Sequence, residues 1–204
     1  MAVMLDAADE DAVARAASVV QEGGTVIYPT ETCYGLGCDA TDPEAIEQVY
    51  DIKQRPREKG LTAIVADLAM AEEYCVLSDR ERAVVEAFMP GPLTLVAEKT
   101  DAVPDTLNEA LAFRVPGSEV ARLLPEKAGV PVVATSANVS GAPSSYRVEE
   151  VSEEVVDAVD VVLDAGELEE SASSTVISIS ETRVTVHRDG PVTRDKVEAV
   201  LHGS

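Results

Sequence analysis

The chain has 204 residues and carries 16 Lys and Arg against 38 Asp and Glu, so its formal net charge is −22. This length predicts one domain with its own hydrophobic core, and a hydrophobic content of 46% excludes a disordered chain. The acidic excess argues against a nucleic-acid-binding protein, which is normally basic. Its even spread is typical of adaptation to concentrated salt, which screens self-repulsion; a surface that docks a basic partner is the alternative.

Two further exclusions concern the compartment and metal sites. No apolar run reaches the ~18 residues of a membrane span, and the acidic N-terminus has no signal-peptide pattern, so a cytoplasmic protein is expected. Cys33, Cys38 and Cys75 form no CxxC pair, and His187 and His202 are the only imidazoles, which argues against a zinc site. No His lies near Cys33 in the sequence, so the thiols are interpreted as buried or loop residues.

Hydrophobic periodicity alternates between helical and extended segments along most of the chain. Residues 9–22 predict a helix that stops at Gly23 and Gly24. Further helices are predicted over 43–52, 78–88, 118–128 and 148–156, with a last one capped by Thr193. Strands are predicted over 25–28, 61–66, 93–97, 111–115, 131–135 and 160–164, followed by a hairpin over 175–179 and 183–187. This alternation indicates an α/β fold.

The densest group of chemical signals lies between residues 24 and 62. The first predicted strand ends in turn formers and hydroxyls, Pro29 to Thr32, and a loop with Gly35 and Gly37 follows. Four cations then stand within seven residues, at Lys53, Arg55, Arg57 and Lys59. A cationic site beside strand-end hydroxyls suits an anionic small ligand, such as a phosphate or a carboxylate. A solvated cationic helix end is the alternative.

A dinucleotide fingerprint is rejected in this region. Residues 35–40 fit GxGxxA, but such a fingerprint follows a strand directly and opens a helix. Here a turn over 29–32 intervenes, and the helix begins after Asp42. The chain also lacks GxxxxGK[ST] and GxSxG, so any use of ATP would not follow the P-loop pattern.

Polar residues at strand ends form a second set of candidates. Arg114 lies in an apolar strand, where a charge must be paired or face a cavity. Ser136 and Asn138 stand just beyond a strand, where open α/β sheets bind ligands. An ordinary cap or turn is the alternative for these two residues and for Ser144.

Five motifs resemble the YrdC-like family of threonylcarbamoyl-AMP synthases, in the order of that family and across almost the whole chain. They are PTETCYGLG at 29–37, KQRPREKGL at 53–61, FRVP with Arg114, SANVSG at 136–141, and Ser174-Thr175 followed by Arg188 in HRDGP. Each motif alone is weak, whereas five in order are specific. The resemblance implies one YrdC-like domain over residues 9–202, with a twisted mixed sheet, flanking helices and a concave ligand-binding face.

The resemblance also implies roles for the matching residues. Lys53 and Arg55 would bind the ATP phosphates and act as the catalytic cations, while Arg57 has no assigned role. The nucleotide would further contact Lys59, Ser136, Asn138, Ser144 and Arg188. L-threonine would contact Thr30, Thr32, Arg114, Ala134 and Ser174. Some relatives carry His where this chain has Ile64, so one polar contact to threonine is missing here.

The implied reaction converts L-threonine, bicarbonate and ATP to threonylcarbamoyl-AMP, pyrophosphate and water. Magnesium would accompany ATP, with no metal ligated by the protein, and no covalent enzyme intermediate is needed. The product would pass to a separate transferase that modifies the tRNA adenosine beside the anticodon. Two alternatives remain open: an RNA-binding module, which requires an extended basic stripe, and a carbamoyl transferase that uses another acceptor.

Overall fold

The computed structural model describes residues 2–9 and 11–203. Among these residues, eleven strands form one sheet in the order β1-β9-β2-β3-β8-β4-β7-β6-β10-β11, with β5 beside β6. The strands are β1 (Val3–Asp6), β2 (Val26–Pro29), β3 (Tyr34–Gly37), β4 (Thr62–Ile64), β5 (Cys75–Val76), β6 (Leu93–Lys99), β7 (Leu111–Arg114), β8 (Val132–Ser136), β9 (Val161–Asp164), β10 (Thr175–Ile179) and β11 (Val184–Arg188). The sheet is mixed: β9 pairs in parallel with β1 and β2, whereas β3 pairs antiparallel with β2 and β8.

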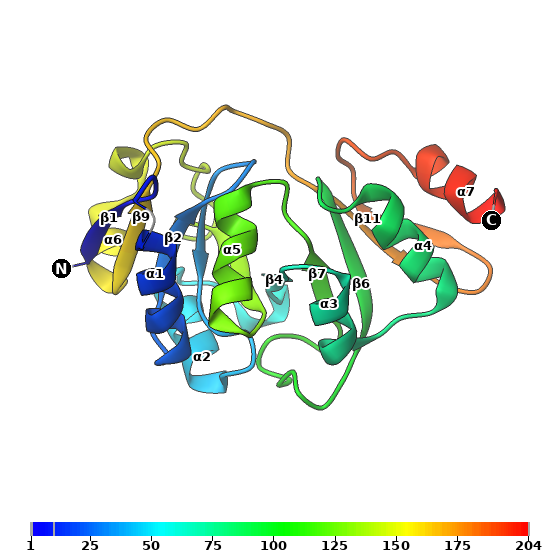
Figure 1. Cartoon of the computed structure of the whole chain (residues 1–204), viewed down its shortest axis with the longest axis horizontal. Helices are drawn as coiled ribbons and strands as arrows, with labels where there is room; N and C mark the ends of the chain where they lie inside the picture. The colour runs from blue at the N-terminus through cyan, green and yellow to red at the C-terminus, as the bar shows by residue number, and fades with distance from the viewer. Residues whose placement is uncertain (1, 10, 204) are drawn as a thin grey trace.

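Helices flank this sheet. They are α1 (Ala12–Gln21), α2 (Pro43–Ile52), α3 (Leu68–Tyr74), α4 (Asp79–Phe88), α5 (Glu119–Ala128), α6 (Glu153–Ala158) and α7 (Arg194–His202). Helices α1 and α5 pack together over one half of the sheet, and α4 packs against α7 at the other end (Figure 1). The segment over 165–174 arches from β9 to β10 and so connects the two halves (Figure 1). The α/β prediction is confirmed.

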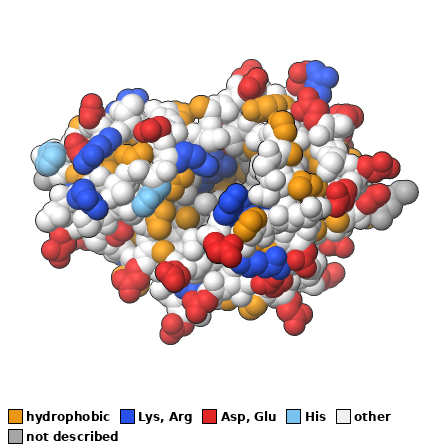
Figure 2. Space-filling view, turned by 180° about the vertical axis from the view of Figure 1, so that it is seen from behind, with side chains coloured by type: hydrophobic (Ala, Val, Ile, Leu, Met, Phe, Trp, Pro, Cys, Tyr) orange, Lys and Arg blue, Asp and Glu red, His pale blue; other side chains and the backbone are white. Residues whose placement is uncertain are grey.

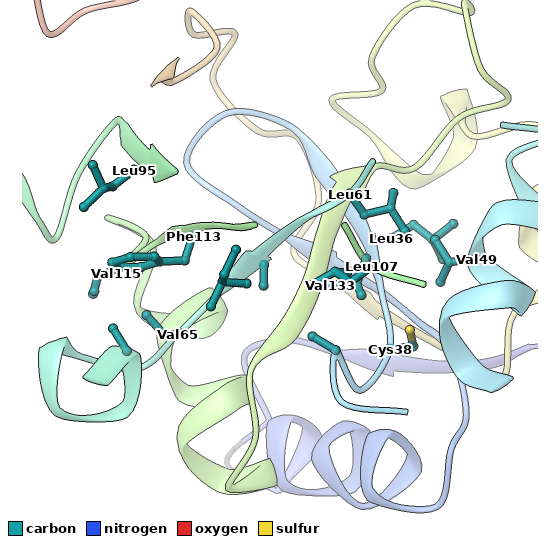
Figure 3. Close-up of a cluster of buried hydrophobic side chains, with 14 of the residues drawn as sticks. Leu36, Cys38, Val49, Leu61, Val65, Leu95, Leu107, Phe113, Val115 and Val133 are labelled. Carbon is teal, nitrogen blue, oxygen red and sulfur yellow. The ribbon is translucent and has the colours of Figure 1, made fainter. Parts of the chain in front are cut away.

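The core has two parts because each central strand sends alternate side chains to opposite faces. Strand β2 directs Ile27 into the larger cluster, while Val26 and Tyr28 join a second cluster beneath α1 and α5. Figure 3 shows part of the larger cluster, including Leu95 and Phe113 from neighbouring strands. Fully burying a side chain of this size stabilises the fold by about 1.5–3 kcal/mol. Within residues 2–9 and 11–203, no helix combines the length and apolar character needed to cross a membrane.

The loop expected around Gly35 and Gly37 is a buried strand, β3. A Cβ on Gly37 would stand 2.2 Å from the Val133 carbonyl oxygen, and one on Gly35 would stand 3.1 Å from the Tyr28 ring. These glycines therefore permit close packing of β3 between β2 and β8. Because the GxGxxA pattern begins on this strand, its rejection as a dinucleotide fingerprint agrees with the structure.

The helix predicted over 148–156 is also wrong. A 3-10 turn spans Val148–Glu150, and α6 begins only at Glu153. Val151 then has an extended backbone, with φ −71° and ψ 131°, which separates the turn from the helix. Strand β1, helix α3 and strand β5 were not predicted. Strand β1 precedes residue 9, the expected start of the domain, and pairs with β9.

Candidate active site

A cavity of about 510 Å³ opens on one face of the sheet, and several separate parts of the chain line it. Five of these parts are the turn after β2, the loop before β4, strands β6 and β7, the end of β8, and the β10–β11 hairpin, and further lining residues are Gly35, Thr62, Ala63, Asn108 and Ser144. Four cations line it, Arg55, Lys59, Arg114 and Arg188, and no Asp or Glu does so among the described residues. Figure 2 shows Lys and Arg around this hollow; many Asp and Glu lie toward the edges of the face, and some lie just below the hollow. A strongly acidic chain thus encloses a cationic cavity.

Thr30 organises the turn after β2. Its hydroxyl oxygen lies 2.9 Å from Thr32 Oγ1, donates to the Cys33 carbonyl at 2.7 Å, and accepts the Cys33 backbone N–H at 3.2 Å. Thr30 is 6% exposed, whereas Thr32 and Cys33 are partly exposed, and all three line the cavity. The turn therefore holds Thr32 and Cys33 at the wall of the cavity.

Arg114 ends β7 as a buried cation that faces the cavity. Its Nη1 donates to Glu31 Oε1 at 2.8 Å, and the two side chains are only 10% and 23% exposed. The other Glu31 oxygen accepts the Ser118 N–H at 3.4 Å, and the Glu31 carbonyl accepts the Ser171 hydroxyl at 2.7 Å. Glu31 thereby ties Arg114 to the start of α5 and to the arching segment. One ion pair leaves further guanidinium donors available, because the group has five N–H bonds.

Lys53 lies beneath the cavity at the end of α2. It is 1% exposed, and its ammonium donates to the carbonyl of Ser136, to the carbonyl of Asn138 at 2.7 Å and to Asn138 Oδ1 at 3.0 Å. The Asn138 amide in turn donates to the Pro143 carbonyl at 2.8 Å. Burial, with a smaller effect from Arg55, lowers the pKa of Lys53 to about 8. Lys53 thus fixes the turn that carries Ser136, which lines the cavity.

Arg55 stands between α2 and β4 and shapes the loop that separates them. Its guanidinium donates to the Lys59 carbonyl at 2.6 Å and to the Gly60 carbonyl at 3.0 Å, while its side chain lines the cavity. Gly60 has φ +36°, and a Cβ there would meet Asn108 at 2.6 Å. Burial lowers the pKa of Arg55. Arg57 points elsewhere: it pairs with Glu47 and with Asp51, and it stacks over Tyr50.

Arg188 and Ser174 form a third polar group at the far side of the cavity. Arg188 donates through Nε to the Ser174 carbonyl and through Nη2 to Ser174 Oγ, both at 2.9 Å. Ser174 Oγ also lies 2.9 Å from Thr94 Oγ1. Burial, and to a smaller extent the charge of Arg114, lowers the pKa of Arg188.

The structure brings most of the predicted site residues to one cavity. The lining includes Thr30, Thr32, Arg55, Lys59, Arg114, Ala134, Ser136, Ser144, Ser174 and Arg188. Lys53 and Asn138 are outside this lining and support it from beneath. Ile64 is fully buried against the second core cluster. Sequence reasoning missed Asn108 and His187, which also line the cavity.

A profile of the Sua5/YciO/YrdC family, described as "Telomere recombination", matches residues 18–190. The chain belongs to the Sua5/YciO/YrdC family. It is 33% identical over 91% of its length to the Threonylcarbamoyl-AMP synthase of Pyrococcus abyssi, and 32% identical over 93% to that of Bacillus subtilis. It spans 56% of each of these two relatives.

A solved structure of another Sua5/YciO/YrdC member shows the same fold. The crystal structure of P. abyssi Sua5 complexed with L-threonine matches 98% of this chain with a TM-score of 0.89 and 31% identity, over 60% of the P. abyssi chain. The family resemblance inferred from five short motifs is therefore confirmed.

Proposed function

We propose that the cavity binds ATP and L-threonine and forms threonylcarbamoyl-AMP from them and bicarbonate. The observation that carries this proposal is the cationic lining of the cavity. Among the described residues, four cations and no carboxylate line it, although the chain has a net charge of −22. A triphosphate and an amino-acid carboxylate are both anions, and guanidinium groups bind both with charge-assisted hydrogen bonds. The named activity of the relatives and the threonine complex of P. abyssi Sua5 support the same assignment.

The proposed reaction has two steps. The threonine amine attacks bicarbonate carbon, a C–N bond forms, and water leaves to give a carbamate. A carbamate oxygen then attacks the α-phosphorus of ATP, and the bond to the β-phosphate oxygen breaks to release pyrophosphate. Catalysis would come from positioning and from neutralisation of phosphate charge. We assign the neutralisation to Arg55, Lys59 and Arg188, and the hold on the threonine carboxylate to Arg114.

Other groups complete this assignment. Thr32 and Ser174 would bind the polar atoms of threonine, with Thr30 and Ala134 beside them, while Ser136 and Ser144 would contact the nucleotide. Lys53 and Asn138 would hold the turn that presents Ser136.

Magnesium would enter on the triphosphate and keep most of its ligands as phosphate oxygens and water, a mode that suits its preference for oxygen. We place this reaction in the cytoplasm, with the product passing to a tRNA-modifying transferase.

The test is incubation with ATP, L-threonine and labelled bicarbonate, followed by detection of pyrophosphate and identification of the labelled adenylate by mass spectrometry. Wild-type protein should require all three substrates. Arg55→Gln should lower the rate strongly, whereas Arg57→Gln is the matched control, because that guanidinium is engaged by Glu47 and Asp51 away from the cavity. Pyrophosphate release that ignores threonine or bicarbonate would overturn the proposal. Salt-dependent RNA binding without any adenylate would favour the RNA-binding alternative.

A further inference from the structure

One of the four cations that line the cavity differs from the other three in its charge balance. Arg114 forms an ion pair with Glu31, with Nη1 and Oε1 2.8 Å apart. In the part of the chain that the structure describes, no ion pair joins Arg55, Lys59 or Arg188 to a carboxylate. Arg55 and Arg188 donate to carbonyl and hydroxyl oxygens, which carry no net charge. Arg114 therefore presents a neutralised ion pair to the cavity.

Glu31 is fixed behind Arg114 by two other segments of the chain. Its side chain is 23% exposed and does not belong to the cavity lining. The second carboxylate oxygen accepts the backbone N–H of Ser118, the N-cap of α5, at 3.4 Å. The Glu31 carbonyl accepts the hydroxyl of Ser171, in the segment that arches from β9 to β10, at 2.7 Å. The negative charge is thus held beside the guanidinium before any ligand enters.

This pairing changes the kind of anion that Arg114 attracts. A phosphate chain with several charges is attracted by net positive charge, because the Coulomb energy scales with the product of the charges. At the pair of Arg114 and Glu31 the two charges nearly cancel, so a polyanion gains little there. A zwitterionic amino acid has no net charge, and its carboxylate requires directed hydrogen bonds, which the other guanidinium donors of Arg114 supply. The pair therefore favours a carboxylate over a phosphate.

We propose that Glu31 is a positioning residue that sets the anion specificity of Arg114. It reserves this cation for the carboxylate of L-threonine and keeps the phosphates of ATP and pyrophosphate away from it. The inference rests on the proposed function, which assigns Arg114 to threonine. It explains how two anion-bearing substrates occupy one cationic cavity without competing. Without the Glu31 charge, Arg114 would join Arg55, Lys59 and Arg188 as a further phosphate-binding cation.

Competition between L-threonine and inorganic triphosphate tests this role. Calorimetry measures threonine affinity with and without saturating triphosphate for wild-type protein, Glu31→Gln, Glu31→Asp and Glu47→Gln. Triphosphate should change the threonine affinity of wild-type protein little and weaken that of Glu31→Gln by roughly tenfold, which corresponds to about 1.4 kcal/mol. Glu31→Asp keeps the charge and should resist competition as wild-type protein does. Glu47→Gln is the matched control, because it removes the same charge from an ion pair with Arg57 away from the cavity.

A second titration shows whether Glu31 acts through Arg114. Triphosphate alone should bind Glu31→Gln more tightly than wild-type protein. The double variant Glu31→Gln/Arg114→Gln should lose this gain, because the cation that produced it is gone. A glutamine oxygen can still accept the Ser118 N–H, so the melting temperature of Glu31→Gln should stay close to that of wild-type protein.

Each outcome bears on the proposal. It is overturned if triphosphate leaves the threonine affinity of Glu31→Gln unchanged, or if Glu31→Asp permits the same competition as Glu31→Gln. A weaker affinity of Glu31→Gln for both ligands, with a lower melting temperature, would make Glu31 a structural residue only. In these cases wild-type protein that forms the labelled adenylate retains the proposed function. If wild-type protein binds no threonine, or if Arg114→Gln binds it normally, the assignment of Arg114 and this inference fail together.

Discussion

Lys53→Met is the most informative single substitution, because Lys53 is a fully buried cation that lies beneath the cavity rather than in its lining. Methionine has a similar length but no donor, so the carbonyls of Ser136 and Asn138 lose their ammonium partner. The Ser136 carbonyl keeps the Asn138 backbone N–H at 2.9 Å, so only the Asn138 carbonyl is left unsatisfied, at a cost of about 1–3 kcal/mol. Asn138 Oδ1 keeps the Ser136 hydroxyl at 2.6 Å and is not orphaned.

A second effect opposes this loss. Burial lowers the pKa of Lys53 from 10.5 to about 8, a difference of about 2.5. Each pKa unit corresponds to about 1.36 kcal/mol, so keeping Lys53 charged in the folded protein costs roughly 3 kcal/mol at neutral pH. Methionine removes that cost. The two effects nearly cancel, so the free energy of unfolding should change by less than about 2 kcal/mol. At about 2–4 °C per kcal/mol for a domain of this size, the melting temperature should shift by less than about 8 °C.

The effect on ATP should be moderate. The variant loosens the turn that presents Ser136, and a neutral hydrogen bond contributes about 0.5–1.5 kcal/mol, so ATP affinity should fall by at most about tenfold. Circular-dichroism melts and ATP calorimetry measure both quantities, with exposed Lys127→Met as the control. A loss of affinity near 100-fold, with an unchanged melting temperature, would show that Lys53 reaches the phosphates itself and would refute this reasoning.

Three further predictions concern pH, threonine and salt. As the pH rises past about 8, the Lys53 ammonium loses its charge and one of the three N–H groups that donate to Ser136 and Asn138 oxygens. ATP affinity of wild-type protein should therefore weaken between pH 7.5 and 9.5, and Lys53→Met should abolish this dependence. The pKa of Lys53 is about 8 in the folded protein, below its ordinary value of 10.5. Between pH 8 and 10.5 the folded protein therefore binds fewer protons than the unfolded chain, so the contribution of Lys53 to the free energy of unfolding should rise with pH. Arg114→Lys should weaken threonine roughly tenfold and ATP little in calorimetry, because an ammonium cannot both hold Glu31 and form a bidentate contact with a carboxylate; equal losses would contradict the assigned role. The melting temperature should climb between 0.1 and 3 M potassium chloride, because the Debye length falls to ~3 Å at 1 M and self-repulsion of a −22 chain is then screened; indifference to salt would remove the salt-adaptation hypothesis.

The sequence predicted those elements whose local signals agree with their environment. Strand β9 and helix α5 have clear apolar patterns and lie where expected. Strand β3 was missed because its glycines favour a loop prediction. The need for glycine at position 37 comes from the close approach of the Val133 carbonyl, which a local pattern does not contain. Strand β1 was missed because Val3 and Met4 are exposed and its partner lies far along the chain.

The site shows the same division between local and long-range information. Arg114 was identifiable because a charge in an apolar strand must be paired or face a cavity, and Arg55 because it stands in a run of four cations within seven residues. The position of Lys53 beneath its turn depends on Ser136 and Asn138, more than 80 residues away, and no local pattern carries it. His187 was not predicted as a site residue for a similar reason. A β-bulge turns it toward the cavity, and this bulge depends on the pairing of β10 with β11.

The central position of β9 has a consequence for the newly made chain. Val161 of β9 pairs with both Val3 of β1 and Val26 of β2, so this strand inserts between two strands made long before it. Residue 161 follows residue 3 by 158 positions, which at about 5–20 residues per second is roughly 8–30 s of synthesis. During that interval β1 and β2 both present unpaired edges as they emerge from the ribosome. The cavity is completed later still, because Ser174 and Arg188 follow β9 in the chain, so no nascent fragment that ends before residue 188 holds the whole lining.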